Sequence, residues 1–184
     1  MSDTGRRTPG RYHLHEDYAL WIGRIAVIWS STENALNFCI WAVAGIAPTL
    51  GACLTSQIYA MSGRWSALLA LLKIRRAPQR LIDLVNEMAE ASRGPLEIRN
   101  RTVHDAWVWR PDGAVGRFEI TAPKKLRFDI IEIPLDELKA NFETLLKFND
   151  RVVEMRKTIY AALPSLPEMS PEELRPISDD PSRL

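Results

Sequence analysis

The sequence contains little cysteine and little glycine. Among its 184 residues there are two cysteines, Cys39 and Cys53, and nine glycines. So few glycines exclude a collagen-like chain. Both cysteines lie in apolar stretches and form no Cys-x-x-Cys pair, so we interpret them as small reduced hydrophobes. Residues 1–11 are polar and have no apolar signal region, so we predict a cytoplasmic protein.

An excess of charge of either sign is also missing. The 24 Lys and Arg residues nearly balance the 23 Asp and Glu residues, and the net charge of +1 excludes a strongly basic nucleic-acid clamp. The balance is uneven, because residues 164–184 are acidic and the preceding body is mildly cationic. Basic residues of the body cluster in two places, which are either solvated helix ends or a rim that attracts phosphate: Lys73, Arg75, Arg76 and Arg80, and Arg93, Arg99, Arg101 and Arg110.

The short motifs of common nucleotide, metal and hydrolase sites are absent. The chain contains no GxxxxGK[ST] loop, no GxGxxG, no HExxH and no GxSxG elbow. Its few histidines and cysteines are not spaced as metal ligands. We therefore predict no metal site and no cofactor.

Apolar residues at three- and four-residue steps predict a helical body. A long amphipathic helix is expected over residues 20–44, and a second over 54–72 should pack against it as a hairpin. A third helix is expected over 78–106, broken or kinked at Gly94-Pro95. The last helix should follow Pro134 and end near residue 163.

Between the third and last helices the apolar period changes to two. Residues 107–109, 115–121 and 126–133 alternate like strands, and Pro111-Asp112-Gly113 is typical of the turn between the first two. The sequence thus predicts a mostly α fold, with a four-helix-bundle core and a small antiparallel β insertion at about 107–133, before the last helix.

This fold predicts one domain over residues 12–163. Residues 1–11 should be flexible, and 164–184, which hold five of the twelve prolines, should form a disordered tail. The apolar run 35–54 has the length of a membrane span, but Pro48 and Gly51 interrupt it. We expect a buried helix with its loop and no membrane association.

One polar cluster lies near the end of the third helical region, where residues 99–104 read Arg-Asn-Arg-Thr-Val-His. Asn100 and His104 are four residues apart and share a helix face, so the amide can orient the imidazole. Arg99 falls on an apolar stripe, where a guanidinium needs an anion. Glu33 is a candidate, because it interrupts the apolar stripe of the first helix; alternatively, it faces a polar groove.

This hexapeptide resembles the R-N-x-x-x-H form of the Arg-x(4–6)-His motif of the HEPN superfamily. The run W-S-S-T-E-N-A-L at Trp29–Leu36 and the two helices ahead of the motif are similar as well, so that the resemblance covers about residues 18–160. Members of this superfamily are small helical bundles. Many are metal-independent endoribonucleases, and others are nucleotide-binding or accessory domains.

The resemblance implies that Arg99 and His104 are a catalytic pair acting on RNA, with Asn100 in support. An imidazole can move protons at the 2′-hydroxyl and the leaving 5′-oxygen, and a guanidinium can stabilise the charged phosphate. We expect three further residues to line the substrate site, namely Arg101, Trp107 and Glu33. Of these, Trp107 shares a strand face with Trp109 beside His104, so both are candidates for base stacking.

A homodimer is expected for two reasons. One imidazole cannot easily be both base and acid, and Arg99 and His104 are about 140° apart around an ideal helix, so one helix should not present them side by side. In the superfamily two chains commonly bring both motifs to one cleft, which implies a composite active site. The setting implied is toxin–antitoxin or defence, with an antitoxin or regulatory protein as a further partner.

Two residues depart from the family pattern. Some family toxins have a modifiable tyrosine two positions after the histidine; here that residue is Ala106, so this form of control does not carry over. Asp105 would repel a phosphate unless it points away or pairs with Arg101. The alternative function is a non-catalytic helical binding or interaction module, in which Asn100 and His104 form a polar cap and Arg99 an ion pair.

Overall fold

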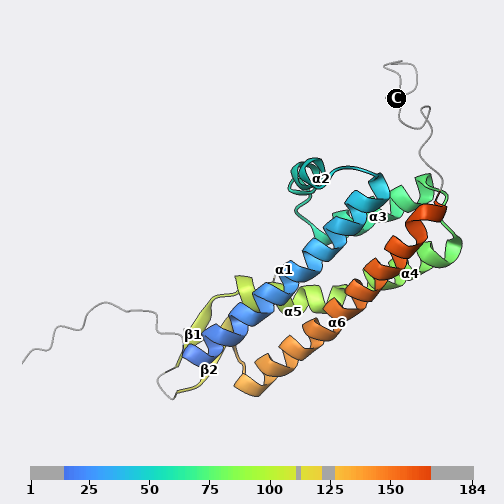
Figure 1. Ribbon diagram of the computed structural model, residues 1–184. Helices are drawn as coiled ribbons and strands as arrows, with labels where there is room; N and C mark the ends of the chain where they lie inside the picture. Colours follow the sequence, from blue (N-terminus) through green and yellow to red (C-terminus); the bar gives the residue numbers. More distant parts are fainter. Residues whose placement is uncertain (1–14, 111–112, 122–126, 167–184) are drawn as a thin grey trace, which may run out of the picture.

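The computed structural model describes residues 15–110, 113–121 and 127–166, and within them the chain is mostly helical (Figure 1). A three-stranded antiparallel sheet precedes the last helix, which confirms the predicted fold class. The helices are α1 (Glu16–Ala44), α2 (Pro48–Thr55), α3 (Met61–Ile74), α4 (Gln79–Ala91), α5 (Arg93–His104) and α6 (Leu135–Ala162); the strands are β1 (Trp107–Trp109), β2 (Val115–Thr121) and β3 (Arg127–Glu132).

Helix α1 is the central element of the bundle. It begins after His15, whose Nδ1 accepts a hydrogen bond from the backbone N–H of Asp17, and it ends before Gly45, whose φ of 68° is the left-handed conformation that favours glycine. Figure 1 shows α1 and α6 running side by side along most of their length, and α1 also packs against α3. The apolar stripe predicted for α1 is buried between these helices: Ile25, Trp29, Leu36 and Ile40.

The second helix predicted over 54–72 is confirmed from residue 61 as α3, which packs against α1, but its predicted start is wrong. Helix α2 ends at Thr55, and α3 begins only at Met61. Contacts with α1 hold α2 in place. Trp41 Nε1 donates to Thr55 Oγ1 at 3.2 Å, and Gly51 lies so close to the Trp41 indole that a Cβ on residue 51 would come within 2.4 Å of the ring. The chain bends by 120° at the break between α1 and α2. The apolar stripe read from the sequence therefore crosses a real break, and Leu54 remains 55% exposed.

The break in the third helical region lies just ahead of its predicted position. Helix α4 ends at Ala91 and α5 begins at Arg93, so that Gly94 and Pro95 belong to the first turn of α5, where proline needs no N–H partner. Ser92 occupies the junction. Its buried hydroxyl accepts from Trp65 Nε1 at 3.1 Å and donates to the carbonyl of Ala89 at 2.6 Å. The bundle thus contains α1, α3, α4, α5 and α6 where four main helices were predicted.

The sheet adjoins the N-terminal end of α1 (Figure 1). Its strands occur in the order β1-β2-β3, and the three predicted strands are confirmed to within a residue at each end. Two side-chain hydrogen bonds attach it to the helices: Trp107 Nε1 donates to the carbonyl of Thr102 at 2.8 Å, and Tyr18 Oη donates to the carbonyl of Ile133 at 3.0 Å. The insertion is therefore attached to the end of α5 and to the start of α1.

The packed body extends slightly beyond the predicted domain end at residue 163. A 3₁₀ turn, η1 (Leu163–Ser165), follows α6, and Leu166 is buried in the core at 5% exposure. Arg75 Nη2 donates to the carbonyl of Leu166 at 3.3 Å. The predictions for residues 1–11 and for most of 164–184 fall outside the described residues.

Over the stretches of chain that the structure describes, no single helix combines the length and apolarity needed to cross a membrane. The bent pair formed by α1 and α2 satisfies that test by length and composition only.

Both cysteines are free thiols, in contrasting surroundings. Burial raises the pKa of the Cys39 thiol to about 12, although Arg156 opposes the shift, whereas Cys53 is exposed. We expect a disulfide reagent at pH 8 to modify Cys53 in the folded protein and Cys39 only after unfolding. The stabilisation from keeping Cys39 protonated should be complete below its unfolded pKa of 9.0 and decline as the pH rises towards 12. Rapid modification of both thiols in the native state would contradict this packing of α1.

Candidate active site on helix α5

The last turns of α5 position the three residues predicted to be catalytic. Thr102 is buried and donates its hydroxyl to the carbonyl of Ile98 at 2.7 Å, which sets the inward face of the helix. Asn100 and His104 are exposed, and Arg99 is half-buried. His104 is the final residue of α5, so its side chain lies at the end of a helix where the chain turns into the sheet.

Arg99 and His104 are in direct contact within one chain. Arg99 Nη1 lies 2.7 Å from His104 Nε2 and 2.9 Å from Asn100 Oδ1. Because a guanidinium carries only donors, a hydrogen bond between these atoms requires Nε2 as the acceptor and therefore the ring proton on Nδ1. The expectation that one helix cannot bring the pair together is wrong: the arginine side chain is long enough to cover the five-residue separation.

The structure also corrects the expected role of Asn100. Its amide oxygen accepts from Arg99, and within the described residues it makes no hydrogen bond with the imidazole. One nitrogen of Arg99, Nη1, therefore contacts both Asn100 Oδ1 and His104 Nε2. Asn100 orients the guanidinium, which in turn contacts His104.

No carboxylate neutralises Arg99 in the described part of the chain. Its Nε is buried without a hydrogen-bond partner, and its Nη1 contacts the side chains of Asn100 and His104. Glu33 is half-buried on α1 and forms no hydrogen bond or ion pair with either Arg99 or His104. The guanidinium keeps its positive charge available for an external anion.

A groove of about 580 Å³ runs along this side of α5. Asn100 and His104 line it together with Arg93 and Arg101, and Glu97 and Asp105 supply the negative charge. The groove combines an imidazole, an amide and two guanidinium groups, which are the functional groups that bind phosphate. A larger groove of about 830 Å³, at the far end of the bundle between α4 and α6, contains no histidine.

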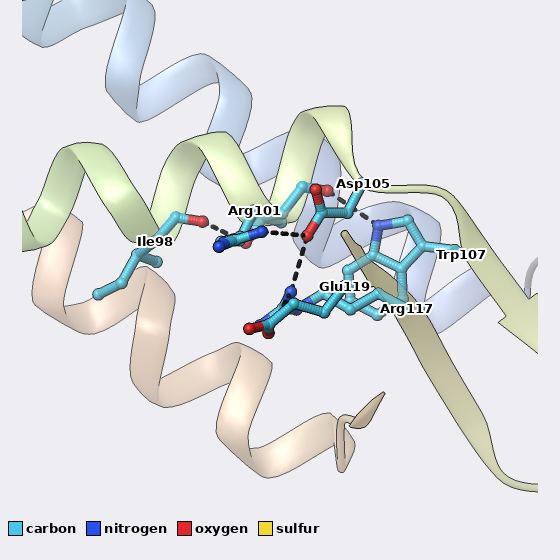
Figure 2. Close-up of polar contacts among 7 residues, drawn as sticks. Ile98, Arg101, Asp105, Trp107, Arg117 and Glu119 are labelled. Carbon is cyan, nitrogen blue, oxygen red and sulfur yellow. Dashed lines mark hydrogen bonds and ion pairs between the residues drawn. The ribbon is translucent and has the colours of Figure 1, made fainter. Parts of the chain in front are cut away.

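Asp105 is turned into an ion-pair cluster with the sheet (Figure 2). Its Oδ2 lies 2.7 Å from Arg117 Nη1 and 3.5 Å from Arg101 Nη1. Arg117 lies in turn 3.3 Å from Glu119 Oε2. The carboxylate next to His104 is thus compensated by two cations, one of which, Arg117, sequence reasoning missed. The alternation of β2 could have indicated it, because Arg117 lies on the face of the strand opposite to the apolar Phe118.

The two tryptophans of β1 differ in accessibility. Trp107 is half-buried, contacts Tyr18 at a ring distance of 6.1 Å, and has its indole N–H bonded to α5. Trp109 is 47% exposed and lies 5.8 Å from the ring of His15. The main role of Trp107 is therefore to attach the sheet to α5, and Trp109 offers more ring surface to a ligand.

In the described ranges, no three His, Cys, Asp or Glu side chains are grouped so that they could hold a metal ion. Comparisons of this chain with models of known families, with curated proteins and with solved structures gave no match.

Proposed function

We propose that this protein is a metal-independent endoribonuclease of the HEPN type, in which Arg99 and His104 are the catalytic residues and Asn100 orients Arg99. The observation that carries the proposal is the 2.7 Å contact between Arg99 Nη1 and His104 Nε2 at an exposed helix end. A guanidinium that has no carboxylate partner and contacts an imidazole is suited to binding a phosphodiester. The groove beside it is lined by further cations.

The chemistry needs only groups that the chain supplies. The RNA 2′-hydroxyl attacks the adjacent phosphorus, a base takes its proton, and the P–O5′ bond breaks as an acid protonates the 5′-oxygen. Neutral His104 can accept the first proton through Nε2 once a phosphate replaces it as the partner of Arg99. Arg99 then donates to the phosphate oxygens as their negative charge grows. The products are a 2′,3′-cyclic phosphate and a 5′-hydroxyl.

A homodimer with a composite cleft belongs to the proposal, because the second proton transfer calls for a second imidazole. The outward face of the sheet supports self-association. Phe118 pairs with Ile130 and Ile120 with Phe128, so all four side chains share this face; Ile120 and Phe128 are 58% and 66% exposed. The face adjoins the motif, since the Phe118 N–H donates to the carbonyl of Ala106 at 2.8 Å.

We expect Ile120→Asp to convert a wild-type dimer into a monomer in sedimentation velocity, because it places a charge in an apolar contact. Val27→Asp is the matched control: Val27 is 72% exposed on α1, away from the sheet, and its replacement should leave the dimer intact. A monomeric wild-type protein, or a dimeric Ile120→Asp variant, would remove this interface. If the wild type is monomeric and Ile120→Asp weakens RNA binding, the face binds RNA instead.

The function itself is tested by incubating the purified protein with RNA in excess chelator. Continued cleavage supports the metal-independent mechanism, and loss of cleavage contradicts it. Binding of RNA or a nucleotide without cleavage would favour the alternative, a non-catalytic binding module. Cytoplasmic RNA as substrate, a toxin or defence role, and an antitoxin or regulatory partner are further parts of this proposal.

A further inference from the structure

We propose that Arg117 is a positioning residue for His104: its ion pair with Asp105 fixes the end of α5 and thereby holds the imidazole beside Arg99. The inference rests on the proposed function and assigns to the β insertion the task of holding its site.

The contact between Arg99 and His104 depends on the last turn of α5 remaining helical. His104 is the last helical residue, and Asp105 leaves the helix with φ −73° and ψ 143°. The Asp105 N–H reaches the carbonyl of Arg101 only at 3.4 Å. Helix ends fray because their last carbonyls lack partners, and the Arg99–His104 contact spans this last turn. Fraying by one turn would separate the imidazole from the guanidinium.

Arg117 supplies the restraint from outside the helix. Its Nη1 lies 2.7 Å from Asp105 Oδ2, and the side chains of Arg117 and Asp105 are only 15% and 19% exposed. Arg101, on α5 itself, reaches the same oxygen at the longer distance of 3.5 Å. Figure 2 shows the two arginines converging on this carboxylate from the helix and from the sheet. A short ion pair with little solvent is stronger than an exposed one.

Arg117 is itself held in place. It lies in β2, paired with Trp107 of β1 and with Ile131 of β3. Its guanidinium also contacts Glu119 at 3.3 Å. Because β2 is hydrogen-bonded to β1 on one side and to β3 on the other, the Arg117 side chain has a fixed base from which to hold the end of α5. The pair also has an electrostatic effect, because without Arg117 the carboxylate beside His104 would keep only the more distant Arg101.

The experiment compares Arg117→Met, Arg117→Lys and a matched control, Lys157→Met. Lys157 lies on α6, and its ammonium forms an exposed ion pair of 2.7 Å with Glu154 on the same helix. In Arg117→Met we expect amide hydrogen exchange in the last turn of α5 to accelerate about tenfold relative to the other helices. We also expect a shifted His104 imidazole signal by NMR, and a kcat roughly tenfold to a hundredfold lower with little change in KM. Arg117→Lys should restore most of each, and Lys157→Met should match the wild type.

Asp105→Asn should reproduce Arg117→Met, and the double variant should add little to either, because both remove one interaction. Unchanged exchange and an unchanged His104 signal in Arg117→Met would overturn the inference, as would exchange that rises equally in all helices. These two measurements do not need activity. If the wild-type protein cleaves no RNA, the proposed function fails, while exchange and NMR still decide whether Arg117 positions His104.

Discussion

His104→Ala is expected to slow RNA cleavage by roughly 10²–10⁴-fold, because it removes the group that transfers protons. Arg99→Ala should slow it by roughly 10²–10³-fold, the usual cost of losing one charged stabiliser of the transition state. The measurement is the single-turnover cleavage rate of each variant at saturating enzyme, together with its thermal unfolding curve.

Matched controls separate catalysis from folding. His15→Ala removes an exposed histidine at the start of α1, and Arg80→Ala removes an exposed arginine on α4; both should cleave at the wild-type rate. The melting temperatures of Arg99→Ala and His104→Ala should be close to that of the wild type, because neither substitution removes an ion pair and His104 is exposed. Cleavage by His104→Ala at the wild-type rate would exclude His104 from catalysis. A large loss of stability in both variants would favour a structural role for the pair.

Leu36→Ala is expected to give a large loss of stability, about 3 kcal/mol, or a melting temperature roughly 10 °C lower. Leu36 is 0% exposed on α1, so the shortened side chain would leave a cavity in the core. Val27→Ala on the same helix should change the free energy of unfolding by less than about 0.5 kcal/mol, because Val27 is 72% exposed. Chemical denaturation of both variants checks this. Equal effects would mean that α1 is rotated from the orientation described.

The periodicity of the sequence predicted the long elements well. Apolar residues at helical spacing, ended by Gly45, indicated α1, and the change to a period of two after Ala106 indicated the sheet. The periodicity was misleading between α2 and α3, where the apolar stripe continues through residues 56–60 although they are not helical. The contact of Gly51 with Trp41, which holds α2 against α1, is tertiary and has no local signature in the sequence.

The candidate site was predicted in its residues but not in its geometry. The motif letters indicated Arg99, Asn100 and His104, but an angle around an ideal helix does not include the reach of an arginine side chain. The contact of Arg99 with His104 therefore became visible only in three dimensions. Arg117 was missed for a related reason: the alternation of β2 indicated which face of the sheet it occupies, but its partner, Asp105, lies outside the sheet, and the sequence carries no spacing that predicts their pairing.

The β insertion connects fold and site in a way that a bare helical bundle would not. Trp107 bonds to a carbonyl of α5, and Arg117 pairs with the first residue after it. Both contacts act on the turn that carries His104. Variation in the sheet can therefore alter the site without changing the motif.

The chemistry of the cleavage products tests most sharply whether Arg99 and His104 act on an RNA phosphodiester. A mixed-sequence RNA and the same strand with 2′-deoxy sugars are incubated in chelator, and the ends of the fragments are analysed. We expect cleavage of the RNA to 2′,3′-cyclic phosphate and 5′-hydroxyl ends, with the deoxy strand left intact. An intact RNA, or equal cutting of the deoxy strand, would contradict it.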